Sequence, residues 1–343
     1  MGLTGIVRDE LFIEHNPGQW HPESPVRLQT IYNLLDSRDR PEVATLTRRF
    51  ANKEEITLVH LPGHYRVIAE TDGKSHGYLD ADTQTSPSSF KAALAAAGGL
   101  ISLTDRVLEG ELDNGFAIVR PPGHHAEANR AMGFCLFNNV AIAAAYALEC
   151  KGLSRVMIVD WDLHHGNGTQ HSFYSDPRVL YFSTHQFPFY PGTGSLGETG
   201  RGKGLGYTVN VPLSWGHSDE DYVSIFQKLV VPLVRSYQPE LILVSAGFDI
   251  YHGDPLGEMR VSSEGFAAMT RLLKTAAEEV CRGRLIFTLE GGYHIEGQAS
   301  GVDQVINVLT NTGSRGKELA ERDRPEPPII EQVRRIQAKF WKL

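Results

Sequence analysis

The feature that most constrains the fold is the alternation of short apolar runs with longer helical patterns. The runs are rich in Val, Ile, Leu and Phe, as expected for strands buried on both faces of a sheet. They lie at residues 116–119, 156–159, 179–183, 241–245 and 285–289, and the helical patterns lie at 88–105, 138–149, 219–237 and 263–281. Such alternation predicts an α/β protein with three layers, in which helices flank a mostly parallel central sheet.

Length and charge narrow the class of protein. The 343 residues, 41% of them apolar, can bury one large core. We predict a single domain over residues 1–343, in which the charged, proline-bearing extension 315–343 ends in a short amphipathic helix. The formal net charge of −8 argues against binding to a nucleic-acid backbone.

The remaining composition suggests a reducing compartment. We find neither a secretory leader nor an apolar run long enough to cross a membrane, so we expect a cytoplasmic protein without a membrane partner. Cys135, Cys150 and Cys281 include no close pair, which excludes a disulfide framework and a cysteine-built zinc site. Any metal must therefore be held by histidine and carboxylate side chains.

Four of the predicted strands run directly into titratable residues. The residues that follow them are His124 and His125, then Asp160, Asp162, His164 and His165, then Asp249, and finally Glu290 and Tyr293. In a parallel sheet, ligands bind outside the carboxyl ends of the strands. We therefore expect these side chains to meet at one edge of the sheet.

Asp162, His164 and Asp249 have the character of a catalytic zinc site. In an extended segment, residues two apart point the same way, so Asp160, Asp162 and His164 share one side and His165 faces the other. Two carboxylates and one imidazole leave open positions for water and substrate, as catalytic zinc requires. Asp160 then lies behind the ligands, and His165 is expected to be a structural, hydrogen-bonded histidine.

The charge of this ligand set predicts the chemistry around it. Two carboxylates largely neutralise Zn²⁺, so a bound water is acidified less than in a three-histidine site, and a protein base is needed. His124 and His125 supply one base and one acid, in an order that the sequence leaves open. Tyr293 follows Gly-Gly and can donate its hydroxyl to a carbonyl oxygen as negative charge develops.

Taken together, the motifs resemble those of the histone deacetylase superfamily, which also holds acetylpolyamine amidohydrolases and acetoin-utilisation proteins. The matching segments are Arg-Pro-Pro-Gly-His-His at 120–125, Gly-Phe-Cys at 133–135, Asp-Trp-Asp-Leu-His-His-Gly-Asn-Gly at 160–168, Pro-Gly-Thr-Gly at 191–194, Asp249, and Glu-Gly-Gly-Tyr at 290–293. The likeness runs from about residue 15 to about residue 309. It implies an arginase/deacetylase-like fold and zinc on Asp162, His164 and Asp249.

The resemblance also implies roles that spacing alone does not reveal. Gly133, Phe134 and Tyr190 would wall an acyl-lysine tunnel, and Arg27 would line a channel for acetate release. A structural potassium ion would be held by Asp160, Asp162, His164, Ser183 and Thr184, largely through main-chain oxygens.

Three positions depart from the commoner family pattern. Asn167 stands where class I enzymes place an aspartate behind the second histidine, so the chain resembles class II and bacterial relatives. Tyr190 replaces the usual phenylalanine, and His294 follows the tyrosine where asparagine is usual.

We therefore predict a zinc-dependent amidohydrolase acting on acetyl-lysine or a related acylated amine. Acetylated lysine in peptides or proteins, acetylated polyamines and longer acyl chains all fit the motifs, because loops at the rim set the choice. The candidates for that rim are residues 78–87 and residues 191–206. In the first segment, Asp80 or Asp82 is the candidate to bind the backbone of a substrate. A homo-oligomer is possible.

Three alternative functions agree less well with the sequence. Residues 197–204 imitate a phosphate-binding loop but lack its final Ser or Thr and lead into a predicted strand at 207–211, so nucleotide binding is disfavoured. An arginase-like two-metal site would need more carboxylates. A non-catalytic protein that binds acylated ligands would be favoured if Tyr293 or a metal ligand were missing, and none is missing.

Overall fold

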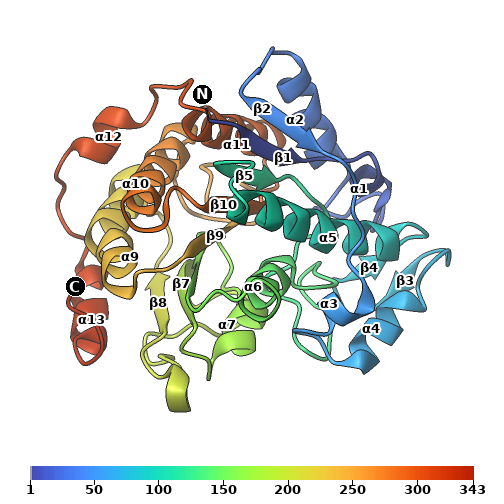
Figure 1. The fold of residues 1–343 in the computed structure, drawn as a ribbon, viewed down its shortest axis with the longest axis horizontal. Helices are drawn as coiled ribbons and strands as arrows, with labels where there is room; N and C mark the ends of the chain where they lie inside the picture. Colours follow the sequence, from blue (N-terminus) through green and yellow to red (C-terminus); the bar gives the residue numbers. More distant parts are fainter. Residues whose placement is uncertain (1) are drawn as a thin grey trace.

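The computed structural model describes residues 2–343, which form an eight-stranded sheet with helices on both faces (Figure 1). The strand order is β2-β1-β5-β10-β9-β6-β7-β8, and every neighbouring pair is parallel. The strands are β1 (Thr4–Val7), β2 (Val43–Leu46), β5 (Asn114–Ala117), β6 (Val156–Asp160), β7 (Val179–Gln186), β8 (Thr208–Leu213), β9 (Leu241–Ala246) and β10 (Leu285–Leu289). The predicted α/β fold is confirmed.

Some strand boundaries differ from those predicted. β5 begins and ends two residues before the apolar run at 116–119, because its pairing with β1 and β10 ends at Ala117. β7 continues to Gln186 because β8 pairs with it that far. β1 and β2 were not predicted, and a two-stranded antiparallel ribbon of β3 (Gly77–Tyr78) and β4 (Gln84–Thr85) lies apart from the main sheet.

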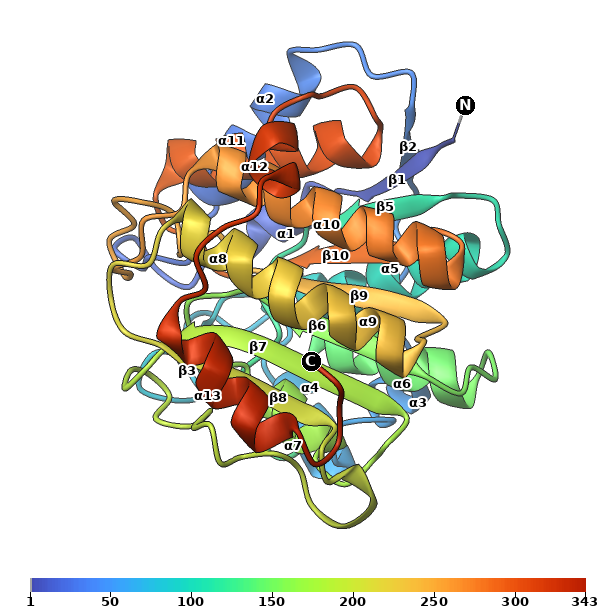
Figure 2. The same cartoon turned by 90° about the vertical axis from the view of Figure 1, so that its left-hand side faces the viewer.

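Two groups of helices cover the sheet (Figures 1 and 2). One layer contains α5 (Ser89–Leu108), α6 (Asn139–Glu149) and α7 (Asn167–Phe173). The other contains α2 (Val26–Asp36), α8 (Asp219–Ile225), α9 (Val231–Tyr237), α10 (Ser263–Cys281) and α11 (Ile295–Leu309). The shorter helices are α1 (Leu11–Glu14), α3 (Lys53–Ile56) and α4 (Pro62–Ala69). With the sheet between them, these helices complete the three predicted layers.

The helix predicted at 219–237 contains a wide turn. A π-helical turn, residues 226–230, joins α8 to α9 just before Pro232, which has no N–H to donate to the preceding turn. The helix begins as predicted, since the Ser218 backbone N–H donates to Asp221 Oδ2 at 2.9 Å. It ends at Gln238, which has a positive φ of 55°.

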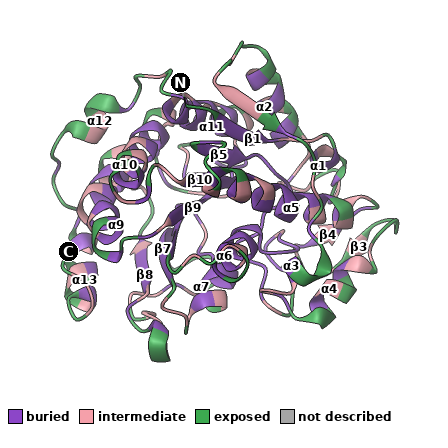
Figure 3. Cartoon of the chain, viewed as in Figure 1, coloured by how far each residue is buried: buried purple, intermediate pink, exposed green. Residues whose placement is uncertain are grey.

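The core lies on both sides of the central strands. Every residue of β1, β5, β6, β7, β9 and β10 is buried (Figure 3). This explains why these strands read as apolar runs rather than as an alternating pattern. Polar side chains are therefore concentrated at the strand ends and in the loops.

The C-terminal segment covers one edge of the sheet. The helix expected near the C-terminus is α13 (Pro328–Gln337), and a further short helix, α12 (Lys317–Glu321), precedes it. α13 packs along the edge strand β8 (Figure 2), where the Gln337 side-chain amide donates to the Thr208 carbonyl at 3.1 Å. Among the described residues, no helix is long and apolar enough to cross a bilayer.

Candidate active site

Four strand ends bring the predicted residues together. In the order β5-β10-β9-β6 these strands are direct neighbours, and because they are parallel their carboxyl ends share one edge. The loops that follow them carry the histidine pair, Tyr293, Asp249 and the segment to His165 that begins after Asp160, the last residue of β6. Residues up to about 170 positions apart in the sequence therefore face one another.

Asp162, His164 and Asp249 form a group with the spacing of metal ligands. His164 Nδ1 lies 3.2 Å from both Asp162 Oδ1 and Asp249 Oδ2. One ligand atom from each residue lies within 4.8 Å of the others, and both carboxylates are buried. The three residues predicted as zinc ligands are thus brought together.

The electrostatics of this group favour a bound cation. Burial, together with the neighbouring Asp162 charge, raises the pKa of Asp249 to about 7. Burial alone would lower the pKa of His164, but the bonds to Asp162 and Asp249 raise it to about 9. His164 Nδ1 thus faces two carboxylate oxygens, an arrangement that favours positive charge at this point.

The outer oxygens of both carboxylates are fixed by backbone N–H groups. Asp162 Oδ2 accepts from Gly291 at 2.8 Å, and Asp249 Oδ1 accepts from Leu163 at 2.8 Å. A Cβ on Gly291 would collide with both carboxylates, and a Cβ on Gly247 would collide with Asp162. Glycine at these positions lets the backbone orient the ligands, and the donor set fits a divalent metal.

The histidine pair lies beside this group, with a different partner behind each ring. His124 Nδ1 is 3.1 Å from Asp160 Oδ2, and His125 Nδ1 is 2.8 Å from Asn167 Oδ1. The ring centroids are 4.0 Å apart. Burial would lower the pKa of His124, but Asp162 and Asp160 raise it to about 10. Burial and neighbouring His124 hold the pKa of His125 well below its ordinary value.

His165 has the structural role predicted for it. Its Nδ1 is 2.7 Å from the Thr193 hydroxyl and its Nε2 is 2.9 Å from Gln170 Oε1. Both ring nitrogens are thus bonded to residues other than the metal ligands, which confirms the hydrogen-bonded, structural role.

Tyr293 is held from both sides of its backbone. The N–H groups of Tyr293 and His294 donate to Asp254 Oδ2 at 2.6 and 2.9 Å. The Arg27 guanidinium donates to the carbonyls of Gly292 and Glu290 at 2.7 and 2.6 Å. Burial raises the pKa of Tyr293 well above its ordinary value, so the phenol remains an O–H donor.

The titratable groups open into one narrow cavity. Its lining is formed by Asp82, Pro122, His124, His125, Gly133, Phe134, His164, Tyr190, Leu256, Gly291 and Tyr293. The predicted wall residues Gly133, Phe134 and Tyr190 are among them. Arg27 is not, because it is fully buried behind the Tyr293 loop, with its Cζ 5.0 Å from the Tyr293 ring centroid.

Asp82 reaches the cavity from the predicted rim and also supports its wall. Its Oδ1 accepts from the Gly133 N–H at 3.2 Å, while the Thr83 hydroxyl accepts from the Phe134 N–H at 3.1 Å. Asp80 does not line the cavity. The Phe189 ring stacks on His164 with the ring centroids 5.7 Å apart, a contact that sequence reasoning missed.

The residues that imitate a phosphate-binding loop have another role. Glu198 accepts from the Gly194 and Ser195 backbone N–H groups at 3.0 and 2.9 Å. The segment ends in a 3-10 turn, Gly202–Gly204, that leads into β8 rather than into a helix. The loop therefore supports the segment next to Tyr190, and the strand predicted after it is confirmed as β8.

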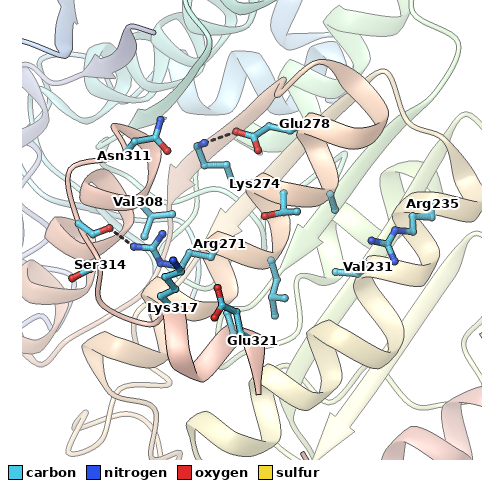
Figure 4. Close-up of a pocket in the computed structure, with 15 residues that line it drawn as sticks. Val231, Arg235, Arg271, Lys274, Glu278, Val308, Asn311, Ser314, Lys317 and Glu321 are labelled. Atoms are coloured by element: carbon cyan, nitrogen blue, oxygen red, sulfur yellow. Dashed lines mark hydrogen bonds and ion pairs between the residues drawn. The ribbon is translucent and has the colours of Figure 1, made fainter. Parts of the chain in front are cut away.

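A larger hollow of about 660 Å³ lies elsewhere, among α9, α10 and α12 (Figure 4). Several of its charged side chains bond within the protein: Lys274 donates to Glu278, and Arg271 donates to the Arg315 and Gly313 carbonyls. It does not include the strand ends that carry the metal ligands. The chemistry of the chain therefore belongs to the narrow cavity.

A comparison with protein families decides the relationship that this geometry suggests. The family model of the histone deacetylase domain matches residues 21–309. The chain belongs to the histone deacetylase family. It is a hydrolase of that family with an Asp-His-Asp metal site.

Individual relatives of this histone deacetylase family protein support the assignment. A "Probable deacetylase" of Archaeoglobus fulgidus is 38% identical over 99% of both chains. "Polyamine deacetylase HDAC10" of Homo sapiens is 42% identical over 93% of this chain but 49% of its own length. The solved structure "Crystal Structure of HDA15 HD domain" matches with a TM-score of 0.90 and 37% identity, covering 99% of this chain and 95% of that one. The chain thus spans about half the length of some curated relatives.

Two further acids support this histone deacetylase site: Asp254, which sequence reasoning missed, and Glu290, whose partners it did not predict. Asp254 fixes the Tyr293 backbone as described above. Buried Glu290 accepts from the Gly123 and His124 N–H groups at 2.6 and 3.1 Å and from the Ser245 hydroxyl at 3.0 Å. Glu290 opens the motif at 290–293 and was expected at this edge of the sheet, but its bonds to the Gly123 and His124 backbone were not predicted.

Proposed function

We propose that this protein is a zinc-dependent deacylase that hydrolyses the amide of an N-acetyl-lysine or a related acylated amine. The observation that carries the proposal is the shared cavity of His124, His125, His164 and Tyr293, which lies directly against the Asp162 and Asp249 carboxylates. The cavity thus combines a metal group, a proton-transfer pair and a hydroxyl donor.

Zinc suits the donor set of one imidazole nitrogen and two carboxylates. When bound there, zinc would act as a Lewis acid toward the substrate carbonyl and would lower the pKa of water. Asp162, His164 and Asp249 would hold it, and the backbone N–H groups of Gly291 and Leu163 would keep both carboxylates oriented.

The protein side chains would then divide the proton transfers. One of His124 and His125 accepts the proton of the attacking water, and the other donates a proton to the amine as the C–N bond breaks. Both rings line the cavity, and their Nδ1 atoms are bonded to Asp160 and Asn167, so their Nε2 atoms are available for this work.

Tyr293 would stabilise the charge on the substrate oxygen. Its phenol stays protonated because burial raises its pKa, and so it can donate to the carbonyl oxygen as negative charge develops. Asp254 and Arg27 fix the backbone on either side of it, so little reorganisation is needed during the reaction.

The substrate would enter between Phe134 and Tyr190, which are on the cavity wall. The narrow passage suits an extended side chain that ends in a small acyl group, and acidic Asp82 suits a substrate that carries positive charge or amide donors. Acetyl-lysine in a peptide or protein is our first candidate. An acetylated polyamine is the second, and similarity to a polyamine deacetylase favours keeping it.

A potassium ion is proposed beneath the zinc group. Asp160 and Ser183 are register partners on β6 and β7, next to Thr184. The Thr184 hydroxyl is buried without a hydrogen-bond partner, which suits a nearby ion bound by oxygen atoms. Asp162 and His164 would contribute main-chain oxygens.

The proposed function is tested by removing and restoring the metal. The protein, stripped with a chelator, is assayed before and after addition of one equivalent of zinc on an acetyl-lysine peptide, acetylputrescine and a longer-chain acyl-lysine peptide. We expect activity to vanish and return, with the acetyl-lysine peptide preferred. Full activity after stripping would reject the zinc mechanism. If the protein binds zinc but hydrolyses none of the three substrates, a non-catalytic binding protein would be favoured.

A further inference from the structure

The hydrogen bonds behind His125 continue beyond Asn167. Asn167 Nδ2 donates to Glu127 Oε1 at 2.6 Å, and Glu127 Oε1 is also 2.8 Å from His171 Nδ1. His171 lies on α7 and its side chain is 47% exposed, so the chain of contacts runs from the cavity to the protein surface. Glu127 itself is buried.

This chain of contacts determines how the Asn167 amide is oriented. An ionised carboxylate only accepts hydrogen bonds, so the amino end of Asn167 must face Glu127. Its second hydrogen donates to the His125 carbonyl at 3.3 Å. The carbonyl end of the amide then faces His125 Nδ1, which must carry the hydrogen. His125 Nε2 therefore keeps its lone pair.

Glu127 is expected to be ionised. Burial would raise the pKa of Glu127, but hydrogen bonds from His171 and Asn167 and the nearby Arg130 charge lower it below its ordinary value. His171 has a raised pKa, chiefly through its bond to Glu127, with Glu198 also contributing. A negative charge thus lies one amide group behind His125, whereas Asp160 places a carboxylate directly behind His124.

We infer that Glu127 is a positioning residue for the deacylation reaction: through Asn167 it holds His125 in the tautomer whose Nε2 can accept a proton. This inference rests on the proposed function. It also gives a new interpretation of Asn167, which stands where class I enzymes place an aspartate. The negative charge that Asn167 lacks is supplied by Glu127, to which the Asn167 amide donates. Carboxylates that orient a histidine in this way stabilise both its tautomer and its protonated form.

Substitution of Glu127 tests the inference through kinetics. Glu127→Gln should lower kcat about tenfold with little change in KM. The introduced glutamine side chain can donate a hydrogen bond to Asn167, so the Asn167 amide can flip and no longer holds His125 in one tautomer. Glu127→Gln combined with Asn167→Asp restores a carboxylate directly behind His125 and should recover most of the lost kcat. Glu240→Gln removes a charge at the opposite end of the sheet, where Glu240 bonds to Ser154 and Arg155, and should leave kcat unchanged.

A second measurement does not depend on turnover. In the zinc-loaded protein, the ring ¹⁵N chemical shifts of His125 should show hydrogen on Nδ1, and Glu127→Gln should shift the population toward Nε2. Zinc content and Tm serve as controls for folding. An unchanged kcat and an unchanged tautomer in Glu127→Gln, or no recovery in the double variant, would overturn the inference. A wild-type protein without activity would refute the proposed function, while the tautomer measurement would still test Glu127.

Discussion

At the residue scale, the site is a set of buried charges held by backbone groups. Asp162 and Asp249 would repel each other in the protein interior without a cation between them, and the raised pKa of Asp249 reflects that repulsion as well as burial. The Gly291 N–H and the absence of side chains at Gly247 and Gly291 let the chain approach both carboxylates closely. The backbone thus orients the two carboxylates for metal binding, in addition to the ligand side chains themselves.

Tyr293 gives the clearest prediction at this scale. Tyr293→Phe removes a hydroxyl but keeps the ring that packs beside Phe134 at 6.0 Å. Because that hydroxyl is expected to stabilise charge that develops on the substrate oxygen, kcat should fall by about two to three orders of magnitude. Steady-state kinetics on an acetyl-lysine peptide, with metal analysis of the same sample, measures this. Zinc content should match the wild type, and an unchanged kcat would remove Tyr293 from the mechanism.

At the element scale, one buried carboxylate ties the N-terminal part of the chain to the loop after β5. Glu23, just before α2, accepts from Arg27 Nη1 at 2.9 Å and from Arg120 Nη2 at 2.7 Å, and His15 Nε2 lies 3.3 Å away. All four side chains are buried. Because Arg27 also holds the Tyr293 loop, this cluster connects α2 to the active site.

Glu23→Gln should therefore be strongly destabilising. Removing one partner of a buried ion pair leaves uncompensated charge, and we expect the free energy of unfolding to fall by about 3 kcal/mol at pH 7. Urea unfolding followed by circular dichroism measures it. Glu331→Gln, at a surface pair with Arg335, is the matched control and should change the free energy by less than about 0.5 kcal/mol. Equal effects of the two substitutions would contradict the account.

The pH dependence of the same substitution follows from the pKa of Glu23. Burial would raise that pKa, but Arg120 and His15 outweigh burial and lower it. A carboxyl with a lowered folded-state pKa adds stability above its unfolded pKa of about 4.3, and this contribution is lost as the pH falls toward the folded value. The difference between wild type and Glu23→Gln should thus be constant from pH 7 to about 5 and shrink below about pH 4. A difference that grows in acid would contradict this sign.

The helix α13 provides a test of how the sheet edge is covered. Ile330 and Val333 are buried against the body of the protein, and the Trp341 indole donates to the Gly206 carbonyl at 2.7 Å beside β8. Ile330→Ala should lower the free energy of unfolding by about 2 to 4 kcal/mol, because it removes buried methyl groups. Arg335→Ala on the exposed face of α13 is the control and should be nearly neutral. A neutral Ile330→Ala would show that α13 is not firmly docked.

At the scale of the whole molecule, much of the architecture could be predicted because the central strands are buried on both faces. Such strands read as apolar runs, and four of them lead into residues with obvious chemistry, such as Asp162 and His164 after β6. β1 was missed because only Ile6 and Val7 of its four residues are large and apolar. β2 was missed because it is largely half-buried or exposed, so its sequence carries little apolar pattern.

The supporting residues could not be predicted for a different reason. Asp254 bonds to a backbone 39 residues away, and Glu127 bonds to a side chain 40 residues away. Nothing local marks either acid: Asp254 precedes a proline, as in an ordinary turn, and Glu127 follows the histidine pair in a loop. Ligands were predictable from the strand ends, whereas the groups that orient them depend on how the loops pack.

The most direct test of the central claim is an anomalous scattering experiment at the zinc absorption edge on crystals of the zinc-loaded protein. A strong anomalous peak is expected between the side chains of Asp162, His164 and Asp249, and it should be lost in Asp249→Asn. An anomalous peak at any other cluster, or none between these three side chains at full zinc loading, would contradict that claim.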